Sequence, residues 1–273
     1  MEQNLVIKWY TSIDSTNAQA VRESHNAPEG CVWIAEYQTN GRGQRGNVWE
    51  SSAGKNLTFS LLLKPVFFNP TQQFTISEVI SVGICKYLSN KGLNPKIKWP
   101  NDIYINDKKI CGILIENSIN GANLSVSVCG VGLNLNQTSF SPNAPNPTSL
   151  ILESDSNNMH GATEFSLKEE LSLLLTEILS IYNNIKQDSE QIEKLHKEYI
   201  NNLYRYNQLH NFIEIKQNDK LDMPVEKICS GDIVQGRIID VTQNGLLVVN
   251  VCRNAENQEE IKRYSFKEIR YVI

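Results

Sequence analysis

The hydrophobic residues in the first half of the chain fall mostly in short continuous runs. Such runs predict buried strands, at 31–37, 56–63, 96–99, 102–105, 109–116 and 123–135. Between them, residues 72–89 carry apolar side chains at helical spacing, which predicts a core helix that ends at Gly92. Thr16 and Gln19 fit a capping box, so we also predict a short helix that begins near Thr16.

The pattern changes twice in the second half of the chain. Residues 137–149 are rich in Asn, Pro and Ser and predict a loop. Ser166 and Glu169 form a second capping box before a long amphipathic helix, and a further helix is predicted over 188–204. From about residue 228, short strands separated by glycines predict a small barrel-like unit. Because strands precede helices without strict β-α-β alternation, the pattern favours an α+β fold.

Composition and charge narrow the class of protein. The 273 residues suffice for one large domain and a small one, and 40% hydrophobic with 21% charged residues is typical of soluble globular proteins. The net charge of -4 gives no footprint of nucleic-acid binding. The six cysteines show neither a C-x-x-C pair nor zinc-finger spacing, so we expect free, mostly buried thiols in a reducing compartment. No run approaches the roughly 18 apolar residues of a membrane span, and we expect a cytoplasmic protein.

Residues 41–46 (GRGQRG) combine three glycines with two arginines. Formally they match the dinucleotide-binding fingerprint, but residues 47–52 are poor helix starters, so the Rossmann interpretation fails on context. Glycines let the backbone approach a ligand closely, and arginine can fork onto phosphate or carboxylate. Taken alone, the segment favours an anion-binding loop only slightly over a solvated hairpin tip.

Three later segments place polar residues at the ends of strands. Residues 98–102 (KWPND) close a strand with an Asn-Asp pair that suits a metal ion or an oriented nucleophile, although a simple Asx turn is the stronger alternative here. Lys109 begins a strongly apolar strand, where its ammonium group either contacts a buried anion or is solvated. In residues 130–136 (GVGLNLN), glycines leave room on one strand face and alternate asparagines add polar groups.

Together, and in this order, these segments resemble the biotin–protein ligase family. The resemblance runs through residues 14–17 (DSTN), 36–40 (EYQTN), 41–46, Trp49, 98–102, 109–116, 130–136 and 147–150 (PTSL). Gly231, Gly236, residues 244–246 and 266–269 resemble the small SH3-like domain of the family. The resemblance implies a class II synthetase-like catalytic domain over 1–225, with a central mixed or antiparallel sheet and helices, and a small SH3-like β-barrel over 226–273.

The activity implied by the resemblance has two steps. Biotin and ATP, with Mg²⁺, give biotinyl-5′-AMP and pyrophosphate, and a lysine of a biotin carboxyl carrier protein then takes the biotin. The carrier implied is a domain of an acyl-CoA carboxylase. Two alternatives stay open: a lipoate–protein ligase, which shares the adenylate chemistry, and a non-catalytic protein that senses biotin or its adenylate.

Carried over position by position, the resemblance implies three groups of site residues. The catalytic group is Arg42, Lys109 and Asp102. The biotin-binding group is Ser15, Thr16, Asn17, Gln38, Gly41, Arg42, Gly43, Gln44, Lys109 and Gly112. The nucleotide-binding group is Arg45, Trp49, Asn101, Gly132 and Asn134. Hydroxyls and an amide suit the neutral ureido ring of biotin, and the cations suit its carboxylate and the α-phosphate. The metal ligands stay unassigned.

The sequence departs from the family pattern at the fourth position of the glycine-rich loop, where Gln44 replaces the more usual arginine. We hypothesise that Gln44 contacts the ligand through its amide or backbone. The segment 14–17 lies so near the first residue that we expect a monofunctional ligase, without a DNA-binding domain and without sequence-specific DNA binding. The resemblance leaves monomer and homodimer open, since an exposed strand at 128–136 would suit pairing between two copies.

Overall fold

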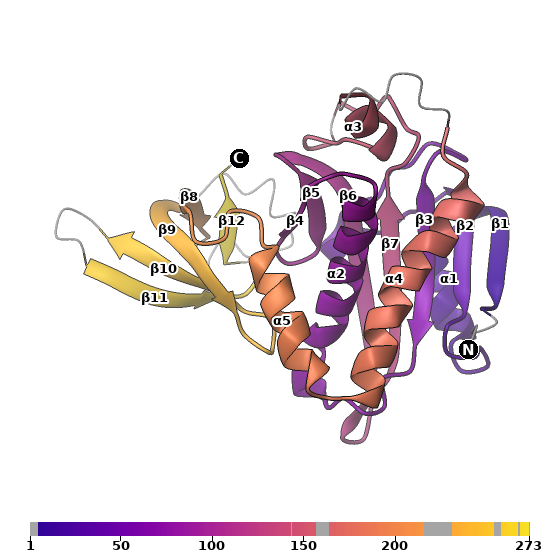
Figure 1. Ribbon diagram of the computed structural model, residues 1–273, viewed down its shortest axis with the longest axis horizontal. Coiled ribbons are helices and arrows are strands. Elements are labelled where there is room, and N and C mark those ends of the chain that lie inside the picture. Colours follow the sequence, from indigo (N-terminus) through magenta and orange to yellow (C-terminus); the bar gives the residue numbers. More distant parts are fainter. Residues whose placement is uncertain are drawn as a thin grey trace.

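The larger of two β-sheets takes up most of the first half of the chain (Figure 1). This computed structural model describes residues 5–142, 144–156, 164–215, 231–253, 258–266 and 268–272. The strands of the larger sheet are β1 (Ile7–Ile13), β2 (Val32–Gln38), β3 (Leu57–Leu63), β4 (Pro95–Lys98), β5 (Asp102–Ile105), β6 (Lys108–Asn120) and β7 (Asn123–Leu133). They lie in the order β1-β2-β3-β7-β6-β5-β4, with β1 parallel to β2 and the other neighbours antiparallel.

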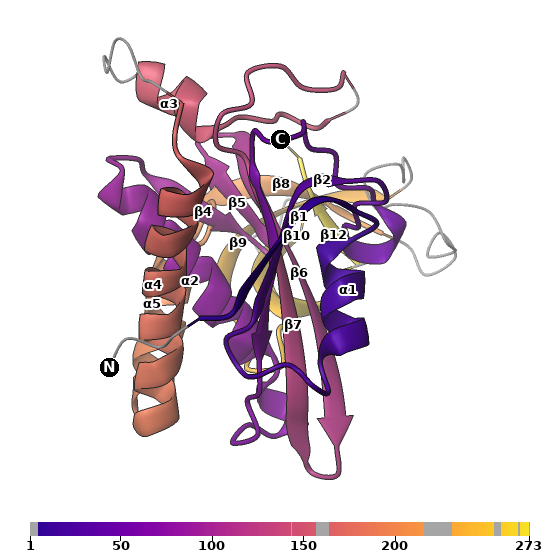
Figure 2. The same ribbon diagram turned by 90° about the vertical axis from the view of Figure 1, so that its right-hand side faces the viewer.

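Helices cover both faces of this sheet. The α-helices are α1 (Thr16–Glu23), α2 (Phe74–Asn90), α3 (Leu150–Ser156), α4 (Leu167–Gln187) and α5 (Gln191–Asn201), and short 3₁₀ turns are η1 (Gln44–Gly46) and η2 (Pro70–Gln72). Figure 2 shows α2 and α4 on one side of the sheet and α1 on the other. A Cβ on Gly83 of α2 would lie 2.6 Å from Cγ1 of Ile178 on α4, so the absent side chain lets the two helices approach closely.

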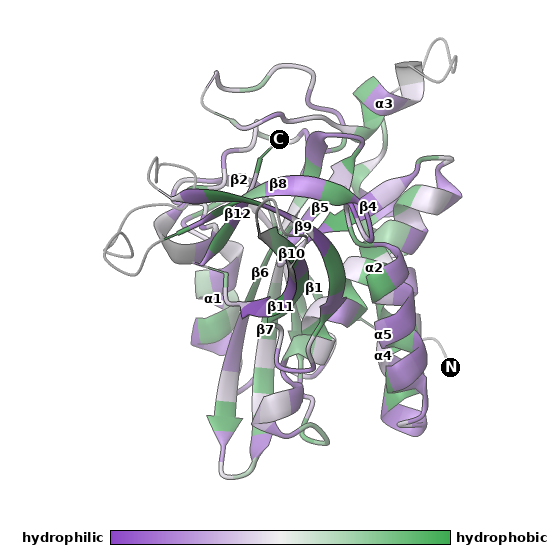
Figure 3. Ribbon diagram, turned by 90° about the vertical axis from the view of Figure 1, so that its left-hand side faces the viewer, coloured by the Kyte–Doolittle hydropathy of each residue, from purple (hydrophilic) through white to green (hydrophobic). Residues whose placement is uncertain are grey.

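The predicted strands and helices around the sheet are confirmed, but the two predicted capping boxes are wrong. Ser15 and not Thr16 caps α1, and Ser166 precedes α4 without a side-chain cap hydrogen bond. Strands β2 to β7 and helices α1, α2, α4 and α5 correspond to predicted segments, and the turn between β5 and β6 contains Asn106 with a φ of 53°, a conformation that asparagine tolerates. Strand β1, helix α3 and strand β8 (Leu209–Glu214) were not predicted. Figure 3 shows hydrophobic and hydrophilic positions alternating along α4 and α5, as their predicted amphipathic character requires.

A second, antiparallel sheet of five strands contains β8, β9 (Asp232–Val241), β10 (Leu247–Arg253), β11 (Gln258–Tyr264) and β12 (Ile269–Tyr271), in the order β11-β10-β9-β8-β12. The α+β class with a small C-terminal β unit is therefore confirmed. Since β8 pairs with β9 and β12, this sheet includes residues ahead of 226. The division of the chain at 225/226 stays a prediction.

The small sheet packs against the larger unit through specific contacts. The indole N–H of Trp99 donates to the carbonyl oxygen of Gly245 at 3.1 Å, and the ring of Phe74 lies against the same glycine. His196 on α5 reaches both Glu78 on α2 and Asp240 on β9. These contacts fix the small sheet beside the first turns of α2. Strand β12 of the small sheet then faces the cavity described below.

The described cysteines are free thiols, as the spacing predicted. Cys31, Cys85, Cys111 and Cys129 are buried, and burial raises the pKa of the last three. Cys229 lies outside the described residues. Among the described residues, none of the helices has the length and apolar character needed to cross a membrane.

Candidate active site

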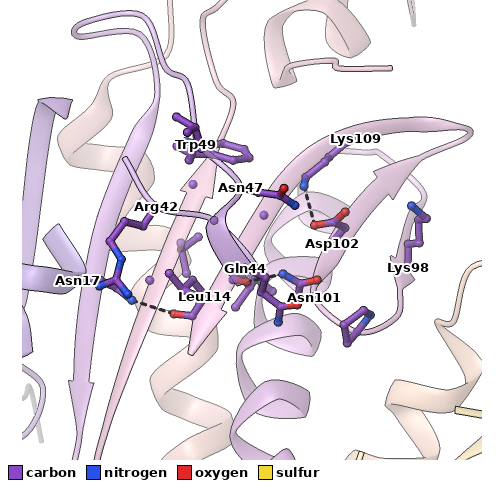
Figure 4. A pocket seen from close by; sticks show the side chains of 18 of the residues that line it. Asn17, Arg42, Gln44, Asn47, Trp49, Lys98, Asn101, Asp102, Lys109 and Leu114 are labelled. Atoms are coloured by element: carbon purple, nitrogen blue, oxygen red, sulfur yellow. Dashed lines mark hydrogen bonds and ion pairs between the residues drawn. The ribbon is translucent and has the colours of Figure 1, made fainter. Parts of the chain in front are cut away.

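One cavity brings together most of the residues singled out from the sequence (Figure 4). The predicted site residues in its lining are Ser15, Thr16, Asn17, Gln38, Arg42, Gly43, Gln44, Trp49, Asn101, Asp102, Lys109, Gly112 and Gly132. They come from the start of α1, the end of β2, the glycine-rich loop, the turn before β5, and strands β6 and β7. Residues more than a hundred positions apart therefore converge on one side of the sheet.

The floor of the cavity is a pair of glycines under a tryptophan. Gly112 and Gly132 face each other across β6 and β7, and the indole of Trp49 lies on them. A Cβ on Gly132 would lie 2.3 Å from Cε2 of Trp49, and one on Gly112 would lie 2.9 Å from Cζ3. The indole can occupy this position only because both side chains are absent. Its Nε1 is buried and has no hydrogen-bond partner among the described residues.

One end of the cavity presents hydroxyl and amide groups. The backbone N–H of Thr16 donates to Oε1 of Gln38 at 2.7 Å, and the Thr16 hydroxyl lies 3.2 Å from the same oxygen. Ser15 caps α1 with a long contact of 3.5 Å to the N–H of Ala18. Ser15, as the cap, stands just outside the helix, and both Ser15 and Thr16 line the cavity.

The opposite end carries charge. Nζ of Lys109 lies 2.7 Å from Oδ1 of Asp102 and 5.6 Å from the centre of the Trp49 ring. Asn101 is tied to β6, since its side chain donates to the carbonyl of Ile113 at 2.7 Å and its own carbonyl accepts from the Ile113 N–H. The turn before β5 therefore holds a carboxylate, an amide and, through Lys109, an ammonium group at one rim of the cavity.

Backbone hydrogen bonds fold the loop over residues 41–49 into a hairpin. Gly43 N–H donates to Asn47 at 2.7 Å, and Trp49 N–H donates to Gly41 at 3.1 Å. A Cβ on Gly41 would lie 2.3 Å from the carbonyl oxygen of Trp49, so a glycine is needed at the base. Arg42 points from this loop to Glu116 on β6, at 2.9 Å between Nη2 and Oε1.

Residues 9–134 match the model of the Biotin/lipoate A/B protein ligase family. The chain is similar to this family over that segment, which is just under half of its length. It is 36% identical over 140 residues to "Bifunctional ligase/repressor BirA" of Bacillus subtilis, an alignment that covers 50% of this chain and 42% of the relative. It is 34% identical over 126 residues to "Biotin--[acetyl-CoA-carboxylase] ligase" of Paracoccus denitrificans, covering 45% of this chain and 51% of the relative. The chain thus spans about half or less of the length of these curated relatives.

Solved structures of the same family extend the likeness to the small sheet. The structure of biotin protein ligase from Aquifex aeolicus in complex with biotin and ATP has a TM-score of 0.72 and 21% identity, covering 98% of this chain and 99% of that one. The Leishmania major biotin protein ligase in complex with biotin has a TM-score of 0.58 and 17% identity, covering 97% and 99%. At these identities the likeness shows a shared fold.

Among the residues predicted for the ligase site whose side chains are described, Gly41 and Asn134 do not line the cavity. Gly41 closes the base of the loop, and the side chain of Arg45 lies outside the described part of the chain. Asn134 follows the last residue of β7, so strand alternation no longer directs its side chain, and its amide donates to the carbonyl of Thr148 at 2.9 Å. The nucleotide-binding roles of Asn134 and Arg45 stay predictions.

The sequence analysis assigned no site role to several residues that line the cavity or contact its lining. Lys98 lies in the lining, as do Phe266, Ile269, Arg270 and Tyr271 from the small sheet. Glu116 lies at the end of the resemblance segment 109–116 but was given no role. Arg270 directly follows the segment 266–269 that resembles the family, and this position was the one hint in the sequence that it contributes to the site. No sequence signal connects Glu116 to Arg42, because 74 residues separate them.

Proposed function

We propose that this protein is a biotin–protein ligase that forms biotinyl-5′-AMP from biotin and ATP and transfers biotin to a lysine of a biotin carboxyl carrier protein. The observation that carries the proposal is one cavity with hydroxyls and an amide at one end and a lysine–aspartate pair at the other. A ligand with a neutral, hydrogen-bonding head group and a carboxylate at the end of an apolar chain fits that distribution.

At the neutral end, Ser15, Thr16 and Gln38 bind the ureido ring of biotin. A buried ureido group needs acceptors for two N–H groups and donors for one carbonyl oxygen. The hydroxyls serve in both roles, and Gln38 has an amide nitrogen for which no hydrogen bond to another described residue is found. This part of the site selects biotin over an acid whose ring lacks such groups.

In the first step, a biotin carboxylate oxygen attacks the α-phosphorus of ATP, and the bond from that phosphorus to the bridging oxygen of pyrophosphate breaks. Both reactants are anionic, so their repulsion has to be offset. Lys109, already held at the cavity by Asp102, supplies one positive charge to the carboxylate and α-phosphate. Arg42 and the backbone N–H group of Gln44 supply further stabilisation from the loop.

In the second step, the neutral amine of the carrier lysine attacks the acyl carbon of biotinyl-5′-AMP. The amide forms, AMP leaves with the electrons of the acyl–oxygen bond, and the amine loses a proton. The loop over residues 41–49 protects the mixed anhydride from water before the carrier arrives.

On the nucleotide side, the floor formed by Trp49 and Gly132 gives the nucleotide an apolar surface, and Asn101 lies at the rim. Lys98 and Arg270 bring two more cations to the lining, so we extend the nucleotide site to the small sheet. Mg²⁺ would arrive with ATP. Among the described residues, no cluster of three or more His, Cys, Asp or Glu side chains suits a metal, and phosphate oxygens would supply most ligands, with Asp102 as the nearby carboxylate. The bound ion would offset phosphate charge.

The test is pyrophosphate release by the purified protein with ATP and Mg²⁺, with biotin or lipoate as the acid, followed by labelling of a carrier domain. We expect release with biotin alone and a labelled carrier. Release with lipoate alone would retain the chemistry and replace the substrate. Biotin binding without release would identify a sensing protein and reject the proposed enzyme.

A further inference from the structure

The carboxylate of Glu116 joins two parts of the site without lining the cavity itself. Oε1 of Glu116 lies 2.9 Å from Nη2 of Arg42, and Oε2 accepts from Nη1 of Arg42 at 3.4 Å and from Nδ2 of Asn17 at 3.0 Å. The Glu116 side chain is 32% exposed and the Arg42 side chain 45%. One carboxylate on β6 therefore holds a guanidinium group of the loop and an amide of α1.

The side-chain amide of Asn17 is held by hydrogen bonds and by close packing. Its Nδ2 also donates to the carbonyl of Leu114 at 3.1 Å, and its Oδ1 accepts from the hydroxyl of Ser60 at 2.5 Å. A Cβ on Gly130 would lie 2.2 Å from Oδ1, so the amide packs against bare backbone. Both N–H donors of the Asn17 amide are used inside the protein. The amide therefore orients Glu116, and the biotin-binding role of Asn17 stays a prediction.

The loop over residues 41–49 depends on side chains for its place on the sheet. Its backbone hydrogen bonds run between its own two arms, so they fix its shape and not its position. Trp49, on the glycine pair of β6 and β7, and Arg42, on Glu116, each attach the loop to the strands below. These two attachments lie on opposite arms of the hairpin, so the contact between Arg42 and Glu116 restrains the arm that Trp49 does not hold.

We propose that Glu116 is a positioning residue that latches this loop over the cavity by holding Arg42. The consequence for catalysis rests on the proposed function, but the latch is a property of the ligand-free protein. With the latch closed, the loop shields the acyl phosphate; with the latch loosened, the intermediate escapes or hydrolyses before transfer. Because a partly exposed ion pair contributes modestly, the effect is a several-fold change and not a loss of activity.

The first experiment measures amide hydrogen exchange in the ligand-free protein. We expect Glu116→Gln to accelerate exchange of the Gly43 and Trp49 amides about two- to fivefold, with β3 unchanged and partial recovery in Glu116→Asp. The matched control is Glu193→Gln, which removes an exposed ion pair with Lys197 on α5. Unchanged exchange in the loop would overturn the latch. Acceleration spread over β6 and β7 would also overturn it, because Glu116 would then support the sheet.

The second experiment uses biotin and ATP with Mg²⁺. In Glu116→Gln we expect biotinyl-5′-AMP to leave the protein about two- to fivefold faster, and the KM for biotin to rise by a similar factor, with a smaller decrease in the rate of pyrophosphate release in the first turnover. Equal retention of the intermediate in an active wild type and the variant would overturn the latch. Absence of pyrophosphate release in the wild type would instead reject the ligase, while the exchange measurement would still decide the latch.

Discussion

The ammonium group of Lys109 lies 2.7 Å from a carboxylate oxygen of Asp102, across the hairpin formed by β5 and β6. Both side chains are mostly buried, with 23% and 18% of their surfaces exposed. A bulge between Ile103 and Tyr104 shifts the register of the pair of strands. The carboxylate orients the lysine before any anion arrives, which removes part of the ordering cost of the first step.

The first prediction concerns this pair. Lys109→Ala removes a cation that stabilises the charge developing at the α-phosphate, so we expect pyrophosphate release to fall about a hundredfold or more. Asp102→Asn keeps the shape but loses the charge-assisted contact, and we expect a decrease of about tenfold. The measurement is initial rates with biotin and ATP.

The neighbouring Lys108 gives a matched control for the lysine variant. Its side chain is 60% exposed, lies 3.6 Å from Glu153 and is absent from the cavity lining. Lys108→Ala should therefore retain the wild-type rate. Equal losses in the two lysine variants would show that positive charge near the hairpin matters in a general way, and Lys109 would lose its specific role.

The second prediction concerns the floor of the cavity. In Gly132→Ala the new methyl group would lie 2.3 Å from Cε2 of Trp49, so the indole has to move off the floor. We expect a changed Trp49 fluorescence and a KM for ATP raised about tenfold, since the displaced indole loses contacts with the nucleotide. The Trp49→Phe background serves as the control, because in it Gly132→Ala should leave the fluorescence unchanged. An unchanged KM for ATP in Gly132→Ala alone would contradict the proposed contact between the Trp49 indole and the nucleotide.

Much of the fold could be predicted because the central strands are buried on both faces. All seven residues of β3 are buried, and a continuous apolar run of that kind is readable directly. Strand β1 escaped because it lies at the edge of the sheet and mixes exposed with half-buried positions. Strand β8 escaped for a similar reason, since it contains His210 and Asn211 and only Phe212 is fully buried.

The site was harder to predict where tertiary pairing sets the role of a residue. The glycine-rich loop and the Lys109 strand carry local signals, and the structure brings them to one cavity. The partner of Arg42 and the contribution of Arg270 depend on which strands become neighbours, and no local pattern reports that. Asn134 shows the converse. Its strand-like spacing predicted a side chain on the ligand face of the strand, but the strand ends at Leu133, and the nucleotide-binding role of Asn134 stays a prediction.

The third prediction assigns the small sheet a part in ATP binding. Arg270 on β12 lines the cavity, whereas Arg263 on β11 is exposed and does not. We expect Arg270→Ala to raise the KM for ATP about tenfold with little effect on the KM for biotin, because one charge-assisted contact to phosphate is lost. Arg263→Ala should leave both values unchanged. A selective rise in the KM for biotin would place Arg270 at the other substrate.

The last prediction is a dependence of stability on pH, set by a histidine between the two sheets. Nδ1 of His196 lies 2.6 Å from Oε1 of Glu78, and Nε2 lies 3.3 Å from Oδ1 of Asp240 on the small sheet. The hydrogen bond to Glu78 raises the pKa of His196 above 6.5 against the opposing effect of burial, and burial raises the pKa of Glu78. A raised histidine pKa gives stability that is fully present below pH 6.5 and is lost as pH rises through the folded-state pKa.

The raised pKa of the Glu78 carboxyl also lowers stability as the pH rises. Burial disfavours the ionised carboxylate in the folded protein, so the folded state loses stability relative to the unfolded state when this acid ionises. We therefore expect the Tm to fall by about 2–4 °C as the pH rises from 6 to above the folded-state pKa of His196, and we expect this part of the pH dependence to disappear in His196→Gln. The control is His25→Gln, at an exposed position. The measurement is thermal unfolding across that range. A Tm that rises with pH, or an identical slope in His196→Gln, would show that the histidine is neutral between its two carboxylates.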